Sequence, residues 1–246
     1  MNASPLPEVI FDRRCEHCPV RHHAICSALD NHGCHALSDI MIHKNFVPGQ
    51  PLWSEEDEAH VFAIVISGTV KLFKMLADGR QQVVGFLFPS DCLGRAFSET
   101  RQTSAEAATD VEICCFPRQQ FEHVLKHHSE LEYALLEKTL NDLDRARDWM
   151  VALGRKSASE KIASFLLQMS HKSELTKCPH NRPSPNLPTF VLPFSRNEIA
   201  DYLGMTIETV SRNLTKLRVS GVIRLVDGRT VEVCDPDELA SLAELQ

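Results

Sequence analysis

The C-terminal third of the chain contains two short helical patterns separated by a glycine, in the stretch FSRNEIADYLGMTIETVSRNLTKLRVSGVI (residues 194–223). Ser195 is placed to cap a first helix, and Gly204 supplies a tight turn after it. Thr206 is placed to cap a second helix, which ends before Gly221. The apolar positions are Ile199, Ala200 and Leu203 on the first helix and Ile207, Val210, Leu214 and Leu217 on the second. Two short helices joined at a glycine are typical of a helix-turn-helix.

The polar face of the second helix carries side chains suited to reading base pairs. An arginine matches the two acceptors of guanine and a carboxylate accepts from the cytosine amine, which makes Arg212 and Glu208 candidate base-reading residues. The alternative is an ordinary surface ion pair, since the two are four residues apart. Their place near the start of the second helix favours base readout. The predicted DNA-binding residues are Thr206, Glu208, Thr209, Ser211, Arg212 and Lys216.

The segment after this helix supports the same interpretation. A β-hairpin is predicted around Asp227-Gly228, which would form a wing behind the two helices. The whole chain has a formal net charge of −7, which by itself argues against a nucleic-acid partner. However, residues 196–229 contain six Lys and Arg against four acidic residues. A locally basic segment on an acidic chain predicts that duplex DNA binds at the C-terminal module.

The composition indicates the class of protein. Apolar residues make up 43% of the chain and charged residues 24%, which is ordinary for a globular protein with a core. No apolar run is long enough to span a membrane, and the N-terminus lacks a secretory pattern, so we expect a cytoplasmic protein without a membrane partner. The predicted strands carry no His-x-His pair, and no nucleophile–base constellation is apparent. We therefore expect no enzyme activity.

The N-terminal half shows strand patterns between turn residues. Apolar, β-branched stretches occur at 60–73, 81–88 and 111–116, and Ala77–Arg80 forms a hairpin-type turn between the first two. Several short strands of this kind predict a jelly-roll β-barrel over residues 36–128. With the helices that follow, the fold class is α+β.

Residues 129–155 form one long amphipathic pattern with charges between the apolar positions. Such a helix either packs on its own barrel or pairs with a second copy of itself. The predicted dimerisation residues are Leu136, Leu140, Leu143, Ala146 and Met150. Ser157 and Glu160 then form a capping box that opens the C-terminal domain, predicted over 156–246. A proline-rich stretch at 172–188 inside it is expected to be a linker or an extended loop.

Residues 1–35 contain a cluster of thiols and imidazoles, which we expect to lie on a loop that is ordered by a bound ligand. Cys15, Cys18 and Cys26 have the spacing of metal ligands, and clustered cysteines in a cytoplasmic protein more often bind metal than form disulfides. With His22 or His23 they would complete a zinc site of three cysteines and one histidine. A thiolate-bound iron–sulfur cluster is the alternative and needs a fourth cysteine.

The order of these parts resembles the Crp/Fnr family of transcription regulators over nearly the whole chain. The run I207-E-T-V-S-R212 is similar to the E-x-x-S-R signature with which Fnr-type members read TTGAT half-sites. The resemblance therefore implies specificity roles for Glu208, Ser211 and Arg212. The spacing C15-x2-C18-x7-C26, the segment I113-C-C-F116 and the run D142-L-D-R-A-R-D-W-M-V-A-L-G-R-K156 together resemble the FnrL-type oxygen regulators of the α-proteobacteria.

In that branch a [4Fe–4S] cluster is held by three N-terminal cysteines and one barrel cysteine. The resemblance implies Cys15, Cys18, Cys26 and Cys114 as ligands. Cys115 is the alternative to Cys114, and only one of two neighbours on a strand can face the cluster. Cys34 is a possible spare ligand, although an ordinary thiol is the favoured reading, and no role is expected for Cys92, Cys178 or Cys234.

The resemblance also implies how such a protein acts. A cytoplasmic homodimer would bind palindromes similar to TTGAT-N4-ATCAA and contact RNA polymerase, with the Ala77–Arg80 turn as a candidate contact. Loss of the cluster in oxygen would separate the two copies. Cyclic-nucleotide-binding members have a glutamate after a glycine where this chain has Gly94-Arg95, and R101-Q-T-S104 departs from their phosphate-binding run. We therefore expect no cyclic nucleotide, and a zinc- or thiol-dependent winged-helix regulator remains the alternative function.

Overall fold

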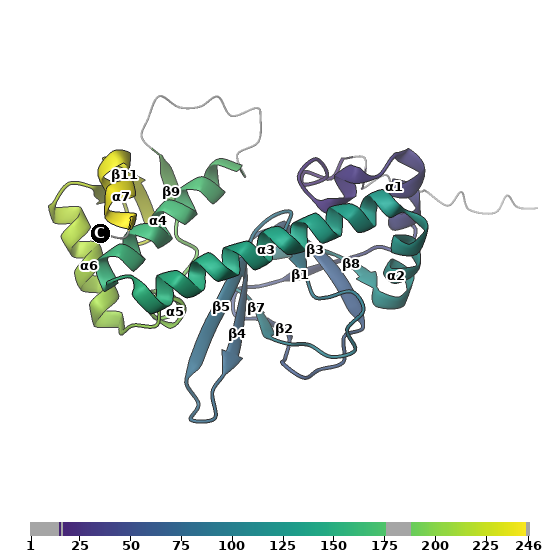
Figure 1. The fold of residues 1–246 in the computed structure, drawn as a ribbon, viewed down its shortest axis with the longest axis horizontal. Helices are drawn as coiled ribbons and strands as arrows, with labels where there is room; N and C mark the ends of the chain where they lie inside the picture. The colour runs from purple at the N-terminus through teal and green to yellow at the C-terminus, as the bar shows by residue number, and fades with distance from the viewer. Residues whose placement is uncertain (1–14, 16, 176–187, 245–246) are drawn as a thin grey trace, which may run out of the picture.

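The computed structural model describes residues 15, 17–175 and 188–244. A β-sheet domain occupies the middle of the molecule, and one long helix, α3, runs along it (Figure 1). The C-terminal module lies at one end of this helix and the N-terminal segment at the other (Figure 1). Among the described residues, no helix is both long and apolar enough to cross a bilayer.

Two four-stranded antiparallel sheets form the β domain, in the orders β1-β8-β3-β6 and β2-β7-β4-β5. The strands are β1 Ile42–Phe46, β2 Pro51–Trp53, β3 Val61–Ser67, β4 Val70–Met75, β5 Gln81–Leu87, β6 Cys92–Leu93, β7 Ser104–Ala107 and β8 Val111–Pro117. Buried side chains of both sheets meet between them, Val65, Val70 and Ile113 among them. The predicted jelly-roll β-barrel is confirmed and is built from these two sheets. Strands β1, β2, β6 and β7 were not predicted.

Two hairpin turns of this domain depend on glycine. Gly79 has a φ of +86° at the exposed tip between β4 and β5, where the hairpin turn was predicted. Gly68 has a φ of +81° between β3 and β4, and a Cβ there would lie 2.0 Å from the carbonyl oxygen of Asp110. Only glycine fits such a position. The predicted stretch 60–73 is therefore two strands with a tight turn between them.

The N-terminal segment is more ordered than predicted. It forms a 3-10 helix, η2 (Ile25–Ala28), and an α-helix, α1 (Asn31–Ser38), whose N-terminus is capped by Asp30. The expectation of a loop is wrong here because the segment has its own apolar side chains. These are Val20, Ala24, Ile25, Leu29 and Leu37, and all are buried. Helix α1 runs across the domain boundary predicted at residue 35.

Two helices follow the sheets. Helix α2 (Arg118–His127) covers part of the β1-β8-β3-β6 sheet, where Phe121 stacks on Phe62 with ring centroids 4.1 Å apart. Helix α3 (Ser129–Arg155) is the long helix predicted over 129–155. Only Leu131 and Ala152 are buried on it, so most of its apolar stripe is not used within one chain.

The C-terminal module contains the predicted helix-turn-helix and wing. Its elements are α4 Ala158–Leu175, β9 Thr189–Val191, α5 Arg196–Leu203, α6 Ile207–Val219, β10 Ile223–Leu225, β11 Thr230–Val233 and α7 Pro236–Ala243. Ser157 and Glu160 form the predicted capping box, and Gly204 ends α5 in the left-handed conformation. Strand β9, which pairs with β11, and helix α7 were not predicted. The predicted linker lies mainly outside the described residues.

Candidate functional site

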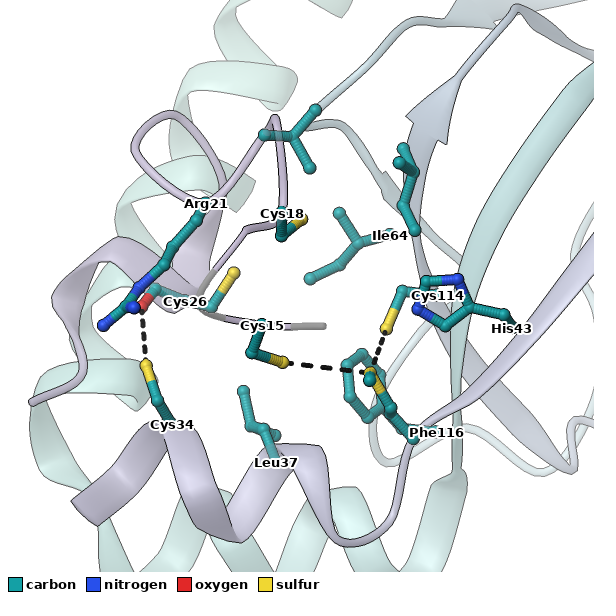
Figure 2. Close-up of a pocket in the computed structure, with 13 residues that line it drawn as sticks. Cys15, Cys18, Arg21, Cys26, Cys34, Leu37, His43, Ile64, Cys114 and Phe116 are labelled. Carbon is teal, nitrogen blue, oxygen red and sulfur yellow. Dashed lines mark hydrogen bonds between the residues drawn. The ribbon is translucent and has the colours of Figure 1, made fainter. Parts of the chain in front are cut away.

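A pocket on the outer face of the β1-β8-β3-β6 sheet is lined by five cysteines (Figure 2). Cys15, Cys18 and Cys26 come from the N-terminal segment, Cys34 from α1 and Cys114 from β8. The rest of the lining is apolar except for Arg21 and His43. The apolar residues are Val20, Leu37, Met41, Ile64, Ile66 and Phe116. The structure thus brings together the four predicted ligands, which are up to 99 positions apart in sequence.

Backbone turns position the N-terminal cysteines beside the barrel. The amide of Cys18 donates to the carbonyl of Cys15 at 3.5 Å, and the amide of Arg21 donates to the carbonyl of Cys18 at 3.2 Å. Cys26 follows on η2, which is anchored by the buried Ile25. Buried apolar residues between the cysteines hold this segment on the sheet, so its fold does not depend on the thiols alone.

Cys114 and Cys115 point to opposite sides of β8. Cys114 belongs to the core beneath the N-terminal segment, together with Ile64 and Phe116. Cys115 is 1% exposed and lies between the two sheets with Ile113. Because side chains alternate along a strand, only Cys114 faces the other cysteines.

Three thiols of this pocket, those of Cys15, Cys26 and Cys114, have raised pKa values. Burial, with smaller effects of the neighbouring Cys18 and Cys15, raises the pKa of Cys26 to about 12. Burial also raises the pKa of Cys15 and of Cys114, and the nearby N-terminal thiols add to the shift of Cys114. Thiolates so close together repel one another in an apolar surrounding. They can all ionise only against a strongly cationic centre, which would release their protons as it binds.

Met41 and His43 are two of the lining residues that were not predicted. The thioether sulfur of Met41 lies 3.8 Å from Sγ of Cys15 and 3.6 Å from Sγ of Cys114, so it connects the two parts of the pocket. His43 is the cross-strand partner of Cys114, and its Nδ1 lies 2.8 Å from Oε1 of Glu112. The sequence contains little indication of either residue, because Met41 directly precedes β1, His43 lies on it, and this strand is short and polar.

The cysteines that were not predicted as ligands, and the nearby histidines, have other surroundings than the four predicted ligands. The thiol of Cys34 points to backbone carbonyls, 3.8 Å from that of Leu29 and 3.9 Å from that of Cys26. His22 and His23 are exposed and do not line the pocket. Cys92 is half-buried beside the same core, Cys234 lies 3.9 Å from the carbonyl of Glu232, and Cys178 lies outside the described residues.

The predicted DNA-binding residues lie on α6 and at its start. Thr206 accepts the amide of Thr209 at 3.3 Å and so caps the helix. Val210, Leu214 and Leu217 are buried, whereas Ile207, predicted on the same apolar face, is 37% exposed. Glu208, Ser211, Arg212 and Lys216 are exposed, and Thr209 is half-buried.

The surface ion pair that was the alternative to base readout is not formed. Both Glu208 and Arg212 are among the described residues, and no contact within 4.0 Å joins their charged groups. The pKa of Glu208 is lowered mainly by its own backbone amide and the Thr206 hydroxyl, with a smaller effect of Arg212. Both side chains therefore remain available to a ligand on this face.

The five predicted dimerisation residues are all exposed on α3, at 54% for Leu136 and 71% for Met150. The alternative, a helix packed on its own barrel, applies near the start of α3, where Leu131 shares a core with Phe62 and Phe121. Near the other end, Trp149 packs on Tyr202 of the C-terminal module. A row of exposed large apolar side chains on one helix is typical of an interface.

The region between Gly94 and Arg101 differs from an open ligand pocket. The guanidinium of Arg101 is buried, lies 3.8 Å from the centroid of the Trp53 ring, and donates to the carbonyl of Val61 at 2.8 Å. A Cβ on Gly94 would lie 2.6 Å from Nη1 of Arg101. The side chain of Arg101 thus fills this part of the barrel.

A β-sandwich joined by a long helix to a winged helix-turn-helix defines a class, the DNA-binding regulators with an N-terminal sensor domain. Residues 43–128 match the family model of the cyclic nucleotide-binding domain, and residues 160–242 match that of the Crp-like helix-turn-helix domain. The chain belongs to the Crp/Fnr family of transcription regulators.

Known proteins with a similar sequence or structure match this chain over most of its length. The chain is 40% identical to the transcriptional activator protein FnrL of Cereibacter sphaeroides, over 96% of this chain and 93% of that protein. It is 38% identical to the nitrogen fixation regulation protein FixK of Bradyrhizobium diazoefficiens, over 93% of each. Among solved structures it resembles FixK2 from Bradyrhizobium japonicum with a TM-score of 0.75 and 28% identity, over 84% of this chain and 99% of that chain.

Proposed function

We propose that this protein is an oxygen-responsive transcription activator in which Cys15, Cys18, Cys26 and Cys114 ligate a [4Fe–4S] cluster. The observation that carries the proposal is the convergence of these four thiols on one apolar pocket (Figure 2). Iron–sulfur clusters are usually held by four cysteine thiolates. FnrL and FixK, to which the chain is similar, are named as an activator and a regulator.

The donor set fits a cluster better than a single zinc ion. Thiolates on one zinc lie ~3.8 Å from one another, because each is about 2.3 Å from the metal in a tetrahedron. Within the described part of the chain, no three Cys, His, Asp or Glu side chains converge closely enough for one metal ion. His22 and His23, the histidines of the zinc alternative, are exposed outside the pocket. A four-iron cluster takes each thiolate on a different iron and so accepts a wider set of sulfurs.

The N-terminal segment is placed to pass its state to α3. Ile25 and Leu29 of the segment share a buried core with Leu131, and Ala134 and Leu135 pack against it. The next residue, Leu136, is the first of the predicted dimerisation residues. A bound cluster would supply an oxygen-labile link between this segment and the barrel. When the link is intact, the segment supports the first turns of α3. It thereby supports the dimerisation seam, the row formed by Leu136, Leu140, Leu143, Ala146 and Met150 on α3.

A dimer along α3 would present two copies of α6 to DNA. Helix-turn-helix dimers read half-sites about one turn of DNA apart, which requires a palindromic site. With Glu208, Ser211 and Arg212 as the reading residues, we infer sites similar to TTGAT-N4-ATCAA. The exposed tip of the β4–β5 hairpin, which contains residues 77–80, projects away from the helices (Figure 1) and is our candidate contact to RNA polymerase. We propose no role for a cyclic nucleotide.

The direct test is to purify the protein without air. The sample is expected to be straw-brown and to contain about four iron and four sulfide per chain. On aeration it should bleach and lose affinity for the palindrome ~10-fold or more, which corresponds to about 1.4 kcal/mol. Colourless, iron-free protein with equal affinity in air and without air would instead indicate a zinc- or thiol-dependent winged-helix regulator.

A pair of variants separates ligands from neighbours. Cys18→Ala removes a predicted ligand, and we expect it to abolish the colour. Cys34→Ala removes a thiol that lines the same pocket but points to backbone carbonyls, and the colour should remain. Loss of the cluster in both variants alike would contradict the assignment of the four ligands.

A further inference from the structure

The DNA-binding module is docked on the barrel through an aromatic contact. Phe86 of β5 stacks on Phe194 with ring centroids 3.7 Å apart, and its ring lies 4.9 Å from that of Tyr202 on α5. Val83, also on β5, is fully buried in the core of the module. The first helix of the helix-turn-helix therefore packs directly on a strand of the sensor domain.

A buried ion pair lies beside the aromatic contact. Lys71 of β4, with a side chain 7% exposed, places Nζ 2.7 Å from Oε1 of Glu106 and 3.1 Å from Oε1 of Glu198. Glu198 also closes the capping box of α5, accepting from the amide of Ser195 at 2.8 Å. Gln82 adds a hydrogen bond across the same contact, donating to the carbonyl of Asp201 at 2.6 Å.

The charges of this pair are maintained by their contacts. Burial by itself would lower the pKa of Lys71, but Glu106 and Glu198 outweigh it and raise the pKa. Burial would likewise raise the pKa of Glu198, but the bonds from Ser195 and Lys71 hold it below its ordinary value. Both groups are therefore charged near neutral pH. Removing Lys71 would leave two partly buried carboxylates without their cation, which is strongly unfavourable.

Helix α3 also contacts Tyr202, the residue of α5 that packs near Phe86 of the barrel. The indole of Trp149 on α3 stacks on the Tyr202 ring, with centroids 4.3 Å apart and an angle of 10° between the planes. Tyr202 is thus held between the barrel and the helix that carries the dimerisation residues. The contact leaves the reading residues of α6 exposed, so it does not block DNA.

From these contacts we infer that Lys71, Phe86 and Trp149 are positioning residues for DNA binding. They hold α5, and α6 packed against it, at one orientation relative to the seam on α3. In a dimer this orientation sets the distance between the two recognition helices and therefore the length of the spacer between half-sites. The inference rests on the proposed dimeric binding to a palindrome.

The test measures affinity for a series of palindromes whose spacer is lengthened or shortened by single base pairs. Wild-type protein, prepared without air, should prefer one spacer by roughly 10-fold or more. In Lys71→Met and Trp149→Leu, this preference should fall towards unity while iron content and dimer fraction stay at the wild-type level. Lys71→Arg should restore it, because the charge and hydrogen bonds are kept.

Lys74→Met is the matched control, since Lys74 lies on the same strand and pairs with Glu55 of the barrel. It should keep the spacer preference. Gln82→Ala, which removes one hydrogen bond across the contact, provides a mild variant if the larger changes reduce folding.

Either of two experimental outcomes would contradict the inference. Folded, coloured variants that select the spacer as sharply as wild type would overturn it and leave the proposed function intact. Wild-type protein without colour and without any spacer preference would overturn the proposed function, and the inference with it.

Discussion

The carboxylate of Asp91, just before β6, forms an ion pair with Lys138 of α3. Asp91 is only 4% exposed, and its second oxygen lies 3.5 Å from Nζ of Lys172 on α4 and accepts the amide of Phe88 at 3.0 Å. One buried carboxylate thus ties the sheet to the long helix and to the first helix of the DNA-binding module. Its neutralisation should loosen both connections.

We expect Asp91→Asn to lower the free energy of unfolding by about 1–3 kcal/mol at neutral pH. Burial raises the pKa of Asp91, but Lys172 and Lys138 outweigh it and hold the pKa below its ordinary value of 3.8. A lowered pKa means that the stabilisation is complete above pH 3.8 and is lost as the pH falls through the lower folded-state pKa. Urea unfolding of both proteins should therefore show a difference that shrinks below pH 3.8. Asp110→Asn, at an exposed position, should show little difference at either pH.

The two adjacent cysteines of β8 should respond in opposite ways. Cys114→Ala removes the thiol that faces the pocket, and anaerobically prepared protein should lose its iron and its visible absorbance. Cys115→Ala should keep both, but it leaves a cavity between the sheets and lowers the free energy of unfolding by roughly 1–2 kcal/mol. Iron analysis and thermal melting distinguish the two outcomes. The reverse pattern would assign the fourth ligand to Cys115.

Arg212→Ala should relax sequence recognition without affecting the proposed cluster. We expect a loss of roughly 1–3 kcal/mol at one base pair of each half-site, because a bidentate contact to a base is lost. Competition with palindromes altered at single positions measures this effect. In contrast, Lys216→Ala should weaken binding to all sequences alike and reduce the salt dependence by about one phosphate contact.

Leu140→Glu should separate the two copies. A carboxylate in the middle of an apolar helix seam must be desolvated or repel its partner, so association should weaken ~100-fold or more, about 2.7 kcal/mol. Analytical ultracentrifugation of anaerobic protein measures the dimer fraction. Val47→Glu makes the same change at an exposed residue between β1 and β2, and it should leave the dimer intact. A Leu140→Glu protein that remains dimeric would place the interface elsewhere.

Much of the fold follows from local patterns. The capping residues Ser195 and Thr206, the glycine at 204 and the apolar spacing between them predicted α5 and α6 with their ends. These signals act within one or two helical turns, so they can be read from neighbours in sequence. Strand β1 and helix α1 were missed, because I42-H-K-N-F46 and N31-H-G-C-H-A-L-S38 are polar and have little apolar periodicity. Strand β1 forms because it pairs with β8, and α1 forms because its Cys34 and Leu37 are buried in the N-terminal core.

The amino-acid sequence by itself predicted the helix-turn-helix, since helix periodicity and capping depend on near neighbours. The family and the residues proposed as ligands followed from the resemblance of its motifs to the Crp/Fnr regulators. Only the tertiary structure decided which of Cys114 and Cys115 faces the N-terminal thiols, and that Met41 and His43 line their pocket. It alone brought Lys71 to Glu198, 127 positions away. Such contacts arise from the packing of whole elements, where the direction of a side chain follows from register and burial rather than from the residues beside it.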